Sequence, residues 1–207
     1  MYALVEDNKI KQIITNPKAM VIGDVRYPAK IFQLWSQSEL NAIGIYEVIT
    51  DSTNKKDEAY YNNTNEEYNF ANGQATRSWG TATPRRLEDS LWTQEDSDNG
   101  DLPSDKSVGD VKIEGLKTEK KRIVKKQASG LLAPTDWYVV KATEVADYNV
   151  PENITTFRAD VRSKSNEMET QIDACNNVDE LKQLYEYTKQ EDETITRPLA
   201  EFPKEVV

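Results

Sequence analysis

The 207-residue chain contains no histidine and a single cysteine, Cys175. Without histidine, Ser-His-Asp catalysis, Cys-His catalysis and every histidine-based metal site are excluded. One cysteine forms no intrachain disulfide and supplies no cysteine cluster for zinc or an iron–sulfur centre. The chain also lacks a run of roughly 18 apolar residues, the length that a membrane-spanning helix requires. Charges at positions 6, 9 and 11 exclude a signal peptide, so we expect cytosolic synthesis and no membrane partner.

Positive charge is in the minority, because 26 lysines and arginines stand against 36 acidic residues, a formal net charge of −10. A basic surface supplies most of the affinity of nucleic-acid and anionic-membrane binders, so this balance argues against both. Four Trp, ten Tyr and four Phe are nevertheless too many aromatic residues for a disordered chain. We expect one ordinary domain or two small ones, with a modest core and long solvated segments.

The first of three sequence zones, residues 1–50, carries patterns typical of short strands and helices. Residues 2–5 and 10–14 are apolar-rich and flank a turn at Asp7-Asn8, which predicts a β-hairpin.

Further along this zone, Ser36 followed by Glu39 predicts a capping box, and Gly44 stands where the short helix would end. The alternating segment 45–49 predicts another strand. We therefore expect residues 1–50 to form a small α+β domain.

The second zone, residues 51–109, is rich in Asn, Asp, Ser, Thr and Gly. Its tyrosines suggest a polar hairpin in which residues 58–61 pair with residues 68–70, and an Asn-Gly pair at 72–73 predicts another turn. Residues 94–109 are acidic and poor in apolar side chains, which is typical of a linker or an exposed loop.

The third zone, residues 110–207, is predicted to be helical. Its clearest helix begins at Pro151, a residue type favoured at the first helical position. The helix carries an apolar stripe at steps of three and four residues, formed by Ile154, Phe157, Val161, Ser165, Met168, Ile172 and Cys175.

Asn177 with Glu180 three residues later predicts a second capping box and another helix. We therefore expect two antiparallel helices joined at Asn176-Asn177. The predicted fold class is α+β, with a small mixed strand/helix N-terminal part, a polar hairpin and linker in the middle, and a C-terminal antiparallel helical hairpin.

Residues 95–106 imitate a calcium-binding loop, with Gly100 at the sixth position. The twelfth position requires a bidentate Glu and holds Lys106, and the first position holds Glu95 where the motif has Asp. We interpret the segment as a solvated acidic linker and predict no metal and no cofactor.

Basic residues concentrate at 112–126, in a helix expected to run from near Ile113 to a break near Gly130 and Pro134. The favoured interpretation is the solvated face of an amphipathic helix, because no aromatic stacking platform lies among the charges. The other interpretation is a patch for an acidic partner or a nucleic acid. The candidate patch residues are Lys117, Lys120, Lys121, Arg122 and Lys125.

No residue of the chain is predicted to be catalytic. Cys175 lies in the apolar stripe, which is typical of a small core residue. Among the carboxylates, Asp136 beside Trp137 has the most apolar context, but an N-cap explains it better, at the start of a short helix carrying Trp137, Val140 and Val145. No nucleotide-binding glycine motif and no HExxH motif occurs. We predict that the protein is not an enzyme.

The stretch 131–144, LLAPTDWYVVKATE, resembles a recurrent module of bacteriophage tail proteins. In that module, as here, a Val-Pro start follows (150–151), then an FRAxVR segment (157–162), an Ile-x-Ala segment (172–174) and a VDEL helix (178–181). The module is similar to the tail assembly chaperone and tail-fibre-assembly-like proteins of phages and prophages. The leader of such chains is also matched, at Tyr27-Pro28, Trp35, Ser36, Glu39-Leu40, Gly44-Ile45 and Glu47-Val48.

This resemblance implies a non-enzymatic tail protein that binds tail or tail-fibre subunits, as a minor structural component of the virion or as an assembly factor. It implies a homo-oligomer or a place in a larger assembly, in the host cytoplasm during assembly or in the virion tail. The family has no catalytic residues to transfer. The middle zone, 51–109, is longer than the family implies, and we expect it to offer a contact surface.

Trp, Tyr and Arg are the residue types that anchor interfaces, so Trp79, Arg85, Arg86 and Trp92 are predicted contact residues. A local satellite core explains them equally well. Two alternatives for the function stay open. One is a nucleic-acid-associated accessory phage protein that uses the basic helix 112–126, and the other is a glycan-binding tail device that uses Trp79 or Trp92.

Overall fold

The computed structural model describes residues 1–204 and combines strands with helices, which confirms the predicted α+β class. Contacts along the chain define two compact units, Met1–Pro84 and Arg85–Val207. The boundary between them lies inside the middle zone of the sequence. Within residues 1–204, none of the helices combines the length and the apolar character that are needed to cross a bilayer.

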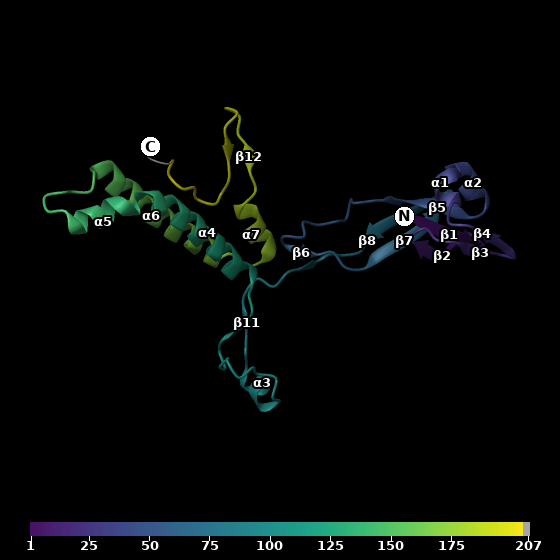
Figure 1. Cartoon of the computed structure of the whole chain (residues 1–207), viewed down its shortest axis with the longest axis horizontal. Helices are drawn as coiled ribbons and strands as arrows, with labels where there is room; N and C mark the ends of the chain where they lie inside the picture. The colour runs from purple at the N-terminus through teal and green to yellow at the C-terminus, as the bar shows by residue number, and fades with distance from the viewer. Residues whose placement is uncertain (205–207) are drawn as a thin grey trace. The chain divides into compact units, whose positions relative to one another are not determined.

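A five-stranded sheet forms the centre of the N-terminal unit, in the order β2-β1-β5-β8-β7 (Figure 1). Neighbouring strands are antiparallel except for β5 and β8, which are parallel. Asp7 and Asn8 connect the first two strands with φ values of 50° and 58°, as a tight hairpin turn requires, and the predicted hairpin is confirmed. The strands are β1 (Tyr2–Glu6), β2 (Lys9–Ile14), β5 (Ile45–Thr50), β7 (Glu66–Ala71) and β8 (Gln74–Trp79).

Two short helices and a small hairpin complete the first half of this unit. The predicted capping box is confirmed, because Ser36 N donates to Glu39 Oε2 (2.7 Å) and Glu39 N donates to Ser36 Oγ (3.3 Å). Gly44 has φ 83°, and a Cβ there would lie 2.7 Å from the carbonyl oxygen of Val5. The elements are β3 (Met20–Ile22), β4 (Val25–Tyr27), α1 (Ile31–Leu34) and α2 (Gln37–Ala42).

Alternation along the strands gives the sheet two apolar faces. One buried cluster, which includes residues of both helices, consists of Leu4, Ile14, Ile31, Phe32, Leu40 and Ile45. The second cluster consists of Ala3, Val5, Val48 and Ala75.

The predicted pairing of residues 58–61 with 68–70 is wrong. Tyr68 and Phe70 lie in β7, which pairs with β8 across the Asn-Gly turn at 72–73. Tyr61 lies in β6 (Tyr61–Asn62) and pairs instead with β9 (Thr83–Pro84). The two-residue turn has φ values of 52° and 75° and closes the tighter hairpin, so it determines the partner of β7.

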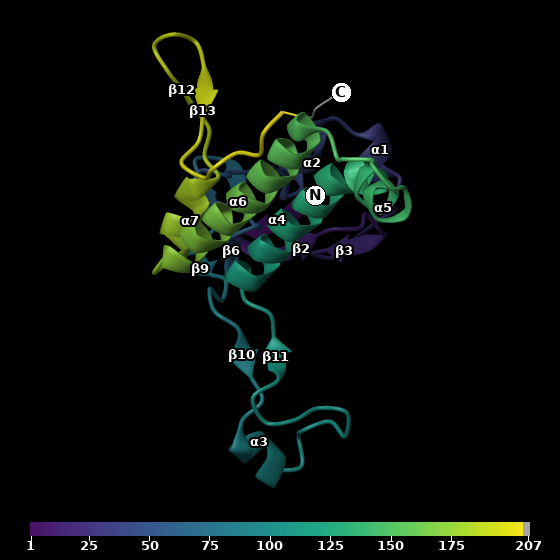
Figure 2. The same cartoon turned by 90° about the vertical axis from the view of Figure 1, so that its left-hand side faces the viewer.

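The C-terminal unit is built on α4 (Leu116–Leu132) and α6 (Glu152–Ala174), which lie side by side (Figure 2). They are antiparallel, because Lys121 near the start of α4 pairs with Asp173 near the end of α6 (2.7 Å). The predicted apolar stripe is confirmed: Ile154, Phe157, Val161, Ser165, Met168 and Ile172 are all buried, and so is Cys175.

Two helices are joined at Asn176-Asn177 as predicted, but the second is short and the stripe finds most of its contacts elsewhere. The helix that follows Asn177 is α7 (Val178–Leu184), which is too short to cover α6, and most of α6 packs on α4 instead. The predicted helix start is confirmed in part, since Asn177 Oδ1 accepts from Glu180 N (2.9 Å) while Glu180 Oε2 accepts from the backbone of Asn176 (2.7 Å). The basic helix α4 begins at Leu116, three residues after the predicted start near Ile113, and ends at Leu132, between Gly130 and Pro134 as predicted.

The remaining elements of this unit are short. The acidic segment 94–109 lies at the end of a two-stranded ribbon, β10 (Ser90–Leu91) with β11 (Val111–Ile113), and includes α3 (Gln94–Asp98) (Figure 2). After α4 come η1 (Ala133–Thr135) and α5 (Asp136–Glu144), and a last hairpin pairs β12 (Thr188–Lys189) with β13 (Ile195–Thr196).

Candidate interaction site

The sequence features that suggest metal or thiol chemistry have structural partners instead. Within residues 1–204, no group of three or more His, Cys, Asp or Glu side chains is placed to hold a metal ion. In the calcium-like segment, Asp96 pairs with Lys112 (2.6 Å), and hydrogen bonds from Lys112 and Thr93 lower the pKa of Asp96 to about 2. Burial raises the pKa of the Cys175 thiol, which opposes formation of a nucleophilic thiolate.

The candidate basic patch on α4 is largely neutralised within its own unit. Lys120 places its Nζ 5.1 Å from the centroid of the Tyr185 ring. A nucleic-acid phosphate would therefore have to displace carboxylates that already occupy most of these cations. The ion pairs are Lys117 with Glu88, Lys121 with Asp173 (2.7 Å), Arg122 with Glu114 (3.6 Å) and Lys125 with Glu169 (3.1 Å).

The start of α4 is fastened to the base of the ribbon. Gly115 N donates to Asp89 Oδ1 (2.7 Å) and Thr118 Oγ1 donates to Asp89 Oδ2 (2.9 Å). The carboxylate of Asp89, a residue outside the helix, therefore caps the N-terminus of α4. A Cβ on Gly115 would collide with the main-chain carbonyl of Glu88. The close approach therefore requires glycine at this position.

The four predicted contact residues are divided between the two units. Trp79 is buried in the N-terminal unit, with Lys55 Nζ and Arg77 Cζ 5.3 and 4.9 Å from its ring centroid, as a local core residue would be. Arg85 and Arg86 belong to the C-terminal unit, at the base of the ribbon. Arg85 pairs with Glu119 (3.1 Å), and the carbonyl oxygen of Arg86 accepts from Leu116 N (2.9 Å).

Trp92, the fourth, is half-buried in the ribbon, and Lys112 Nζ lies 4.4 Å from its ring centroid. Three of the four residues thus have contacts within the C-terminal unit, and Trp79 lies in the other unit.

Residues of the LLAPTDW and FRAxVR segments meet at the end of the α4–α6 pair. Arg158, only 8% exposed, donates from Nη1 to the carbonyl oxygen of Leu132 (3.0 Å) and to Thr135 Oγ1 (2.6 Å). Its Nη2 pairs with Asp136 (2.8 Å). One guanidinium thereby fixes the end of α4 and the start of α5. The predicted N-cap role of Asp136 is wrong, because its carboxylate points to Arg158 and α5 has no side-chain cap.

The apolar residues of the same segments build the core beneath this contact. Phe157 and Val161 are buried against Ala128, with Leu131 and Leu132 packed on them. The two segments are separated in sequence, so their joint role in this end of the helix pair was not visible from spacing.

α5 itself exposes three large apolar side chains, while Tyr138, Lys141 and Ala142 on one face are half-buried. Trp137 is 52% exposed, Val140 51% and Val139 39%, and none of the nine residues of α5 is buried. The ring of Trp137 lies 4.0 Å, centroid to centroid, from that of Tyr138, and Lys141 Nζ lies 5.5 Å from the Trp137 ring. α5 is therefore a helix whose start is held by Arg158 and whose Trp137, Val139 and Val140 side chains remain exposed.

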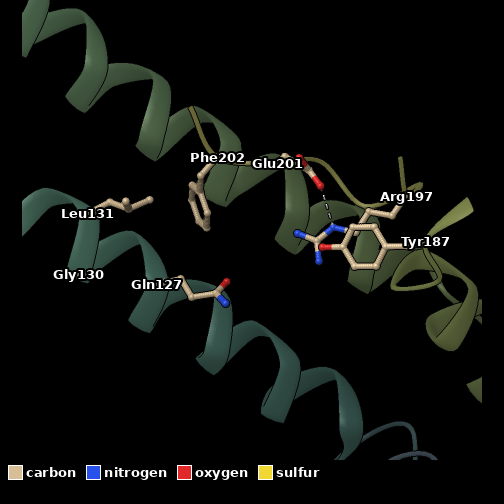
Figure 3. Close-up of a pocket in the computed structure, with 7 residues that line it drawn as sticks. All are labelled: Gln127, Gly130, Leu131, Tyr187, Arg197, Glu201 and Phe202. Atoms are coloured by element: carbon tan, nitrogen blue, oxygen red, sulfur yellow. Dashed lines mark ion pairs between the residues drawn. The ribbon is translucent and has the colours of Figure 1, made fainter. Parts of the chain in front are cut away.

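A second feature is an open cavity of about 470 Å³ between α4 and the C-terminal segment (Figure 3). Leu131 and Phe202 lie at its apolar end. At the other end, Arg197 Nε is 3.5 Å from Glu201 Oε1, and the guanidinium carbon lies 5.2 Å from the Tyr187 ring centroid. The cavity can receive an amphipathic side chain, and it brings together no nucleophile and base. Gln127 and Gly130 complete its lining.

In comparisons with known proteins, no family model, no curated protein and no solved structure matches the chain. The resemblance to phage tail proteins therefore rests on the residues named above and on no overall alignment.

Proposed function

We propose that this chain is a non-enzymatic bacteriophage tail protein that binds tail or tail-fibre subunits, as a minor structural component of the virion or as an assembly factor. It would act in the host cytoplasm during assembly, as part of a larger assembly. The ordered set of LLAPTDW, VP, FRAxVR and VDEL segments supports this proposal from the sequence.

The observation that carries the proposal is the exposure of Trp137 on a helix that Arg158 holds in place. The polar residues of the LLAPTDW segment, Thr135 and Asp136, are engaged by Arg158, whereas the Trp of the same segment points into solvent. Exposed tryptophan on a rigid element is typical of a binding anchor, because little side-chain or backbone entropy is lost on docking.

The alternatives gain less support. The basic residues of α4 are mostly engaged with carboxylates, which weakens the nucleic-acid hypothesis. Trp79 is buried and Trp92 is covered by Lys112, so neither offers the open aromatic platform that a glycan needs.

Mass spectrometry of purified virions from the encoding phage, beside lysate of infected cells, tests the proposal. Presence in virions at fixed stoichiometry supports a structural component. Presence only in lysate, co-purifying with a fibre subunit, supports an assembly factor. Absence of the chain both from virions and from fibre subunits purified from lysate, together with steeply salt-dependent DNA binding by the purified chain, would overturn the proposal.

A further inference from the structure

The C-terminal segment carries an arginine whose hydrogen-bond donors have no acceptor. The Arg197 side chain is only 19% exposed, yet within residues 1–204 nothing accepts a hydrogen bond from its guanidinium. Glu201 Oε1 lies 3.5 Å from Nε without accepting from it. The ring centroids of Tyr185 and Tyr187 lie 6.0 and 5.2 Å from the guanidinium carbon. Since buried polar groups are ordinarily hydrogen-bonded, this guanidinium suits an acceptor from another molecule.

The guanidinium faces the open cavity between α4 and the C-terminal segment (Figure 3). Its terminal nitrogens and the Gln127 amide point into the same space, and Leu131 and Phe202 line the apolar end. The cavity volume of about 470 Å³ lies within the range of roughly 300–1,000 Å³ that is typical of ligand sites. The cavity therefore has room for a short peptide segment.

The segment that carries Arg197 is fixed on the helices before any ligand binds. Leu199 is 2% exposed, and its N–H donates to the last carbonyl of α7 (3.0 Å). The Gln171 side chain on α6 donates to the carbonyl oxygen of Pro198 (3.2 Å) and accepts from Ala200 N (2.8 Å). The charged and apolar walls of the cavity are thus preorganised, which lowers the entropy cost of binding.

Gly130 lies in α4 at the wall of this cavity. Glycine weakens a helix relative to alanine. The backbone of Gly130 is not left-handed, and no atom of the described chain lies within 4 Å of a Cβ built there. Neither turn geometry nor packing within residues 1–204 therefore requires glycine at this position. An occupant of the cavity would require it, because the missing side chain lets that occupant approach the helix backbone.

We propose that this cavity binds a short segment of a tail or tail-fibre subunit that presents a carboxylate beside an aromatic or branched aliphatic side chain. The carboxylate accepts from the two terminal nitrogens of Arg197, the apolar side chain packs on Leu131 and Phe202, and the segment passes over Gly130. The inference rests on the proposed function and adds a second contact to that of α5 in the same unit.

The chemistry of the cavity favours this occupant over a nucleic acid or a free small molecule. The fork of a guanidinium matches the two oxygens of a carboxylate. Glu201 beside Arg197 reduces the local positive charge, which disfavours the repeated phosphates of a nucleic acid. Leu131 and Phe202 favour an apolar group next to the carboxylate. An open cavity leaves part of its occupant outside, as a segment of a larger polypeptide would be, whereas a free ligand is usually enclosed.

The test measures Kd of the full chain for each purified tail and tail-fibre subunit, by biolayer interferometry. Overlapping short synthetic peptides that cover those subunits and this chain are then measured by fluorescence anisotropy. We expect the bound peptides to carry an Asp or Glu next to an aromatic or branched aliphatic residue. Replacing that acid with its amide should raise Kd about 10- to 100-fold.

Gly130→Ala separates binding from folding. The added methyl group occupies space that the segment needs, so Kd should rise about 5- to 50-fold. The same change should raise Tm by about 1–4 °C, so the weaker binding does not come from misfolding. Ser129→Ala is the matched control, because Ser129 is the exposed neighbour on α4 and does not line the cavity. It should change Kd less than about 2-fold.

Arg197→Met tests the charged end of the cavity. Kd should rise about 10- to 100-fold, and the preference for acidic peptides over their amides should disappear. Arg122→Met, at a 65% exposed arginine of α4, removes the same charge outside the cavity and should leave that preference intact. Glu201→Gln removes a competing carboxylate and should lower Kd about 2- to 5-fold.

The outcomes separate the two proposals. Subunit binding that Gly130→Ala and Arg197→Met leave unchanged overturns the cavity inference and leaves the proposed function standing. Equal affinity for acidic peptides and their amides also overturns the inference, as does binding of this chain's own peptides alone, which would assign the cavity to a second copy. Failure of every tail and fibre subunit to bind the wild-type chain overturns the proposed function and the inference that rests on it.

Discussion

Replacing Trp137 with alanine separates a binding role of α5 from a folding role. A tryptophan buries up to about 250 Å² of surface, and the 52% of Trp137 that is exposed corresponds to roughly 120 Å². At about 25 cal/mol per Å², covering that area contributes about 3 kcal/mol to binding. Trp137→Ala should therefore raise the Kd for the bound tail or fibre subunit about 100-fold.

The same change should affect folding little. Trp137 contacts Tyr138 and Lys141 on its own helix, whereas the core beneath α5 is formed by Phe157 and Val161. We expect the free energy of unfolding to fall by less than about 1 kcal/mol, measured by urea denaturation.

Trp35→Ala is a matched control for the binding measurement. Trp35 is 36% exposed and lies in the N-terminal unit, where its ring meets that of Tyr27 at 5.8 Å, centroid to centroid. It should leave Kd unchanged. An unchanged Kd for Trp137→Ala together with a loss of several kcal/mol in the free energy of unfolding would show that Trp137 serves the fold and not binding.

Three further predictions concern the framework around these surfaces. Arg158→Met keeps the apolar stem but removes the donor to the Thr135 hydroxyl, one of two donors to the Leu132 carbonyl and the ionic partner of Asp136, so urea denaturation should show a loss of about 2–4 kcal/mol. Gly115→Ala should lower the free energy of unfolding by about 2 kcal/mol, because the added Cβ collides with the main-chain carbonyl of Glu88. Gly130→Ala should raise it by about 0.5–1 kcal/mol, because nothing lies within 4 Å of the added Cβ. Thermal melts of both variants check this pair. The Asp96 pKa is lowered from 3.8 to about 2, so its contribution to folding is present above pH 4 and is lost as pH falls from about 4 to 2; tryptophan fluorescence should follow that loss, and Asp96→Asn should remove the transition.

Local features of the fold were predictable because a few neighbouring residues determine them. The turn at Asp7-Asn8 and the box formed by Ser36 and Glu39 need only residues within four positions. The stripe of α6 was likewise visible, since burial on one side of a helix repeats every three to four residues.

Partners were harder to predict, because a stripe or an alternating strand shows that a face is buried but not what buries it. The α6 stripe packs mainly on α4, which 19 intervening residues separate from α6, and only to a small extent on the adjacent α7. Similarly, β8 pairs with β7 on one edge and runs parallel to β5 on the other, a crossover that no local pattern specifies.

The candidate surfaces depended on the same long-range information. The lysines of α4 looked free because Asp173 and Glu169, their main partners on α6, lie more than 40 residues away in sequence. Conversely, Trp137 and Val140 have the spacing of core residues, and only the absence of a covering layer within residues 1–204 makes them exposed.

Hydrogen–deuterium exchange of the full chain, with and without each tail and tail-fibre subunit, measures whether a subunit binds through α5. We expect slower exchange in peptides covering residues 136–145 when the cognate subunit is present. Unchanged exchange in those peptides with every tail and fibre subunit of the phage, at concentrations where the subunits are folded, would contradict binding through α5.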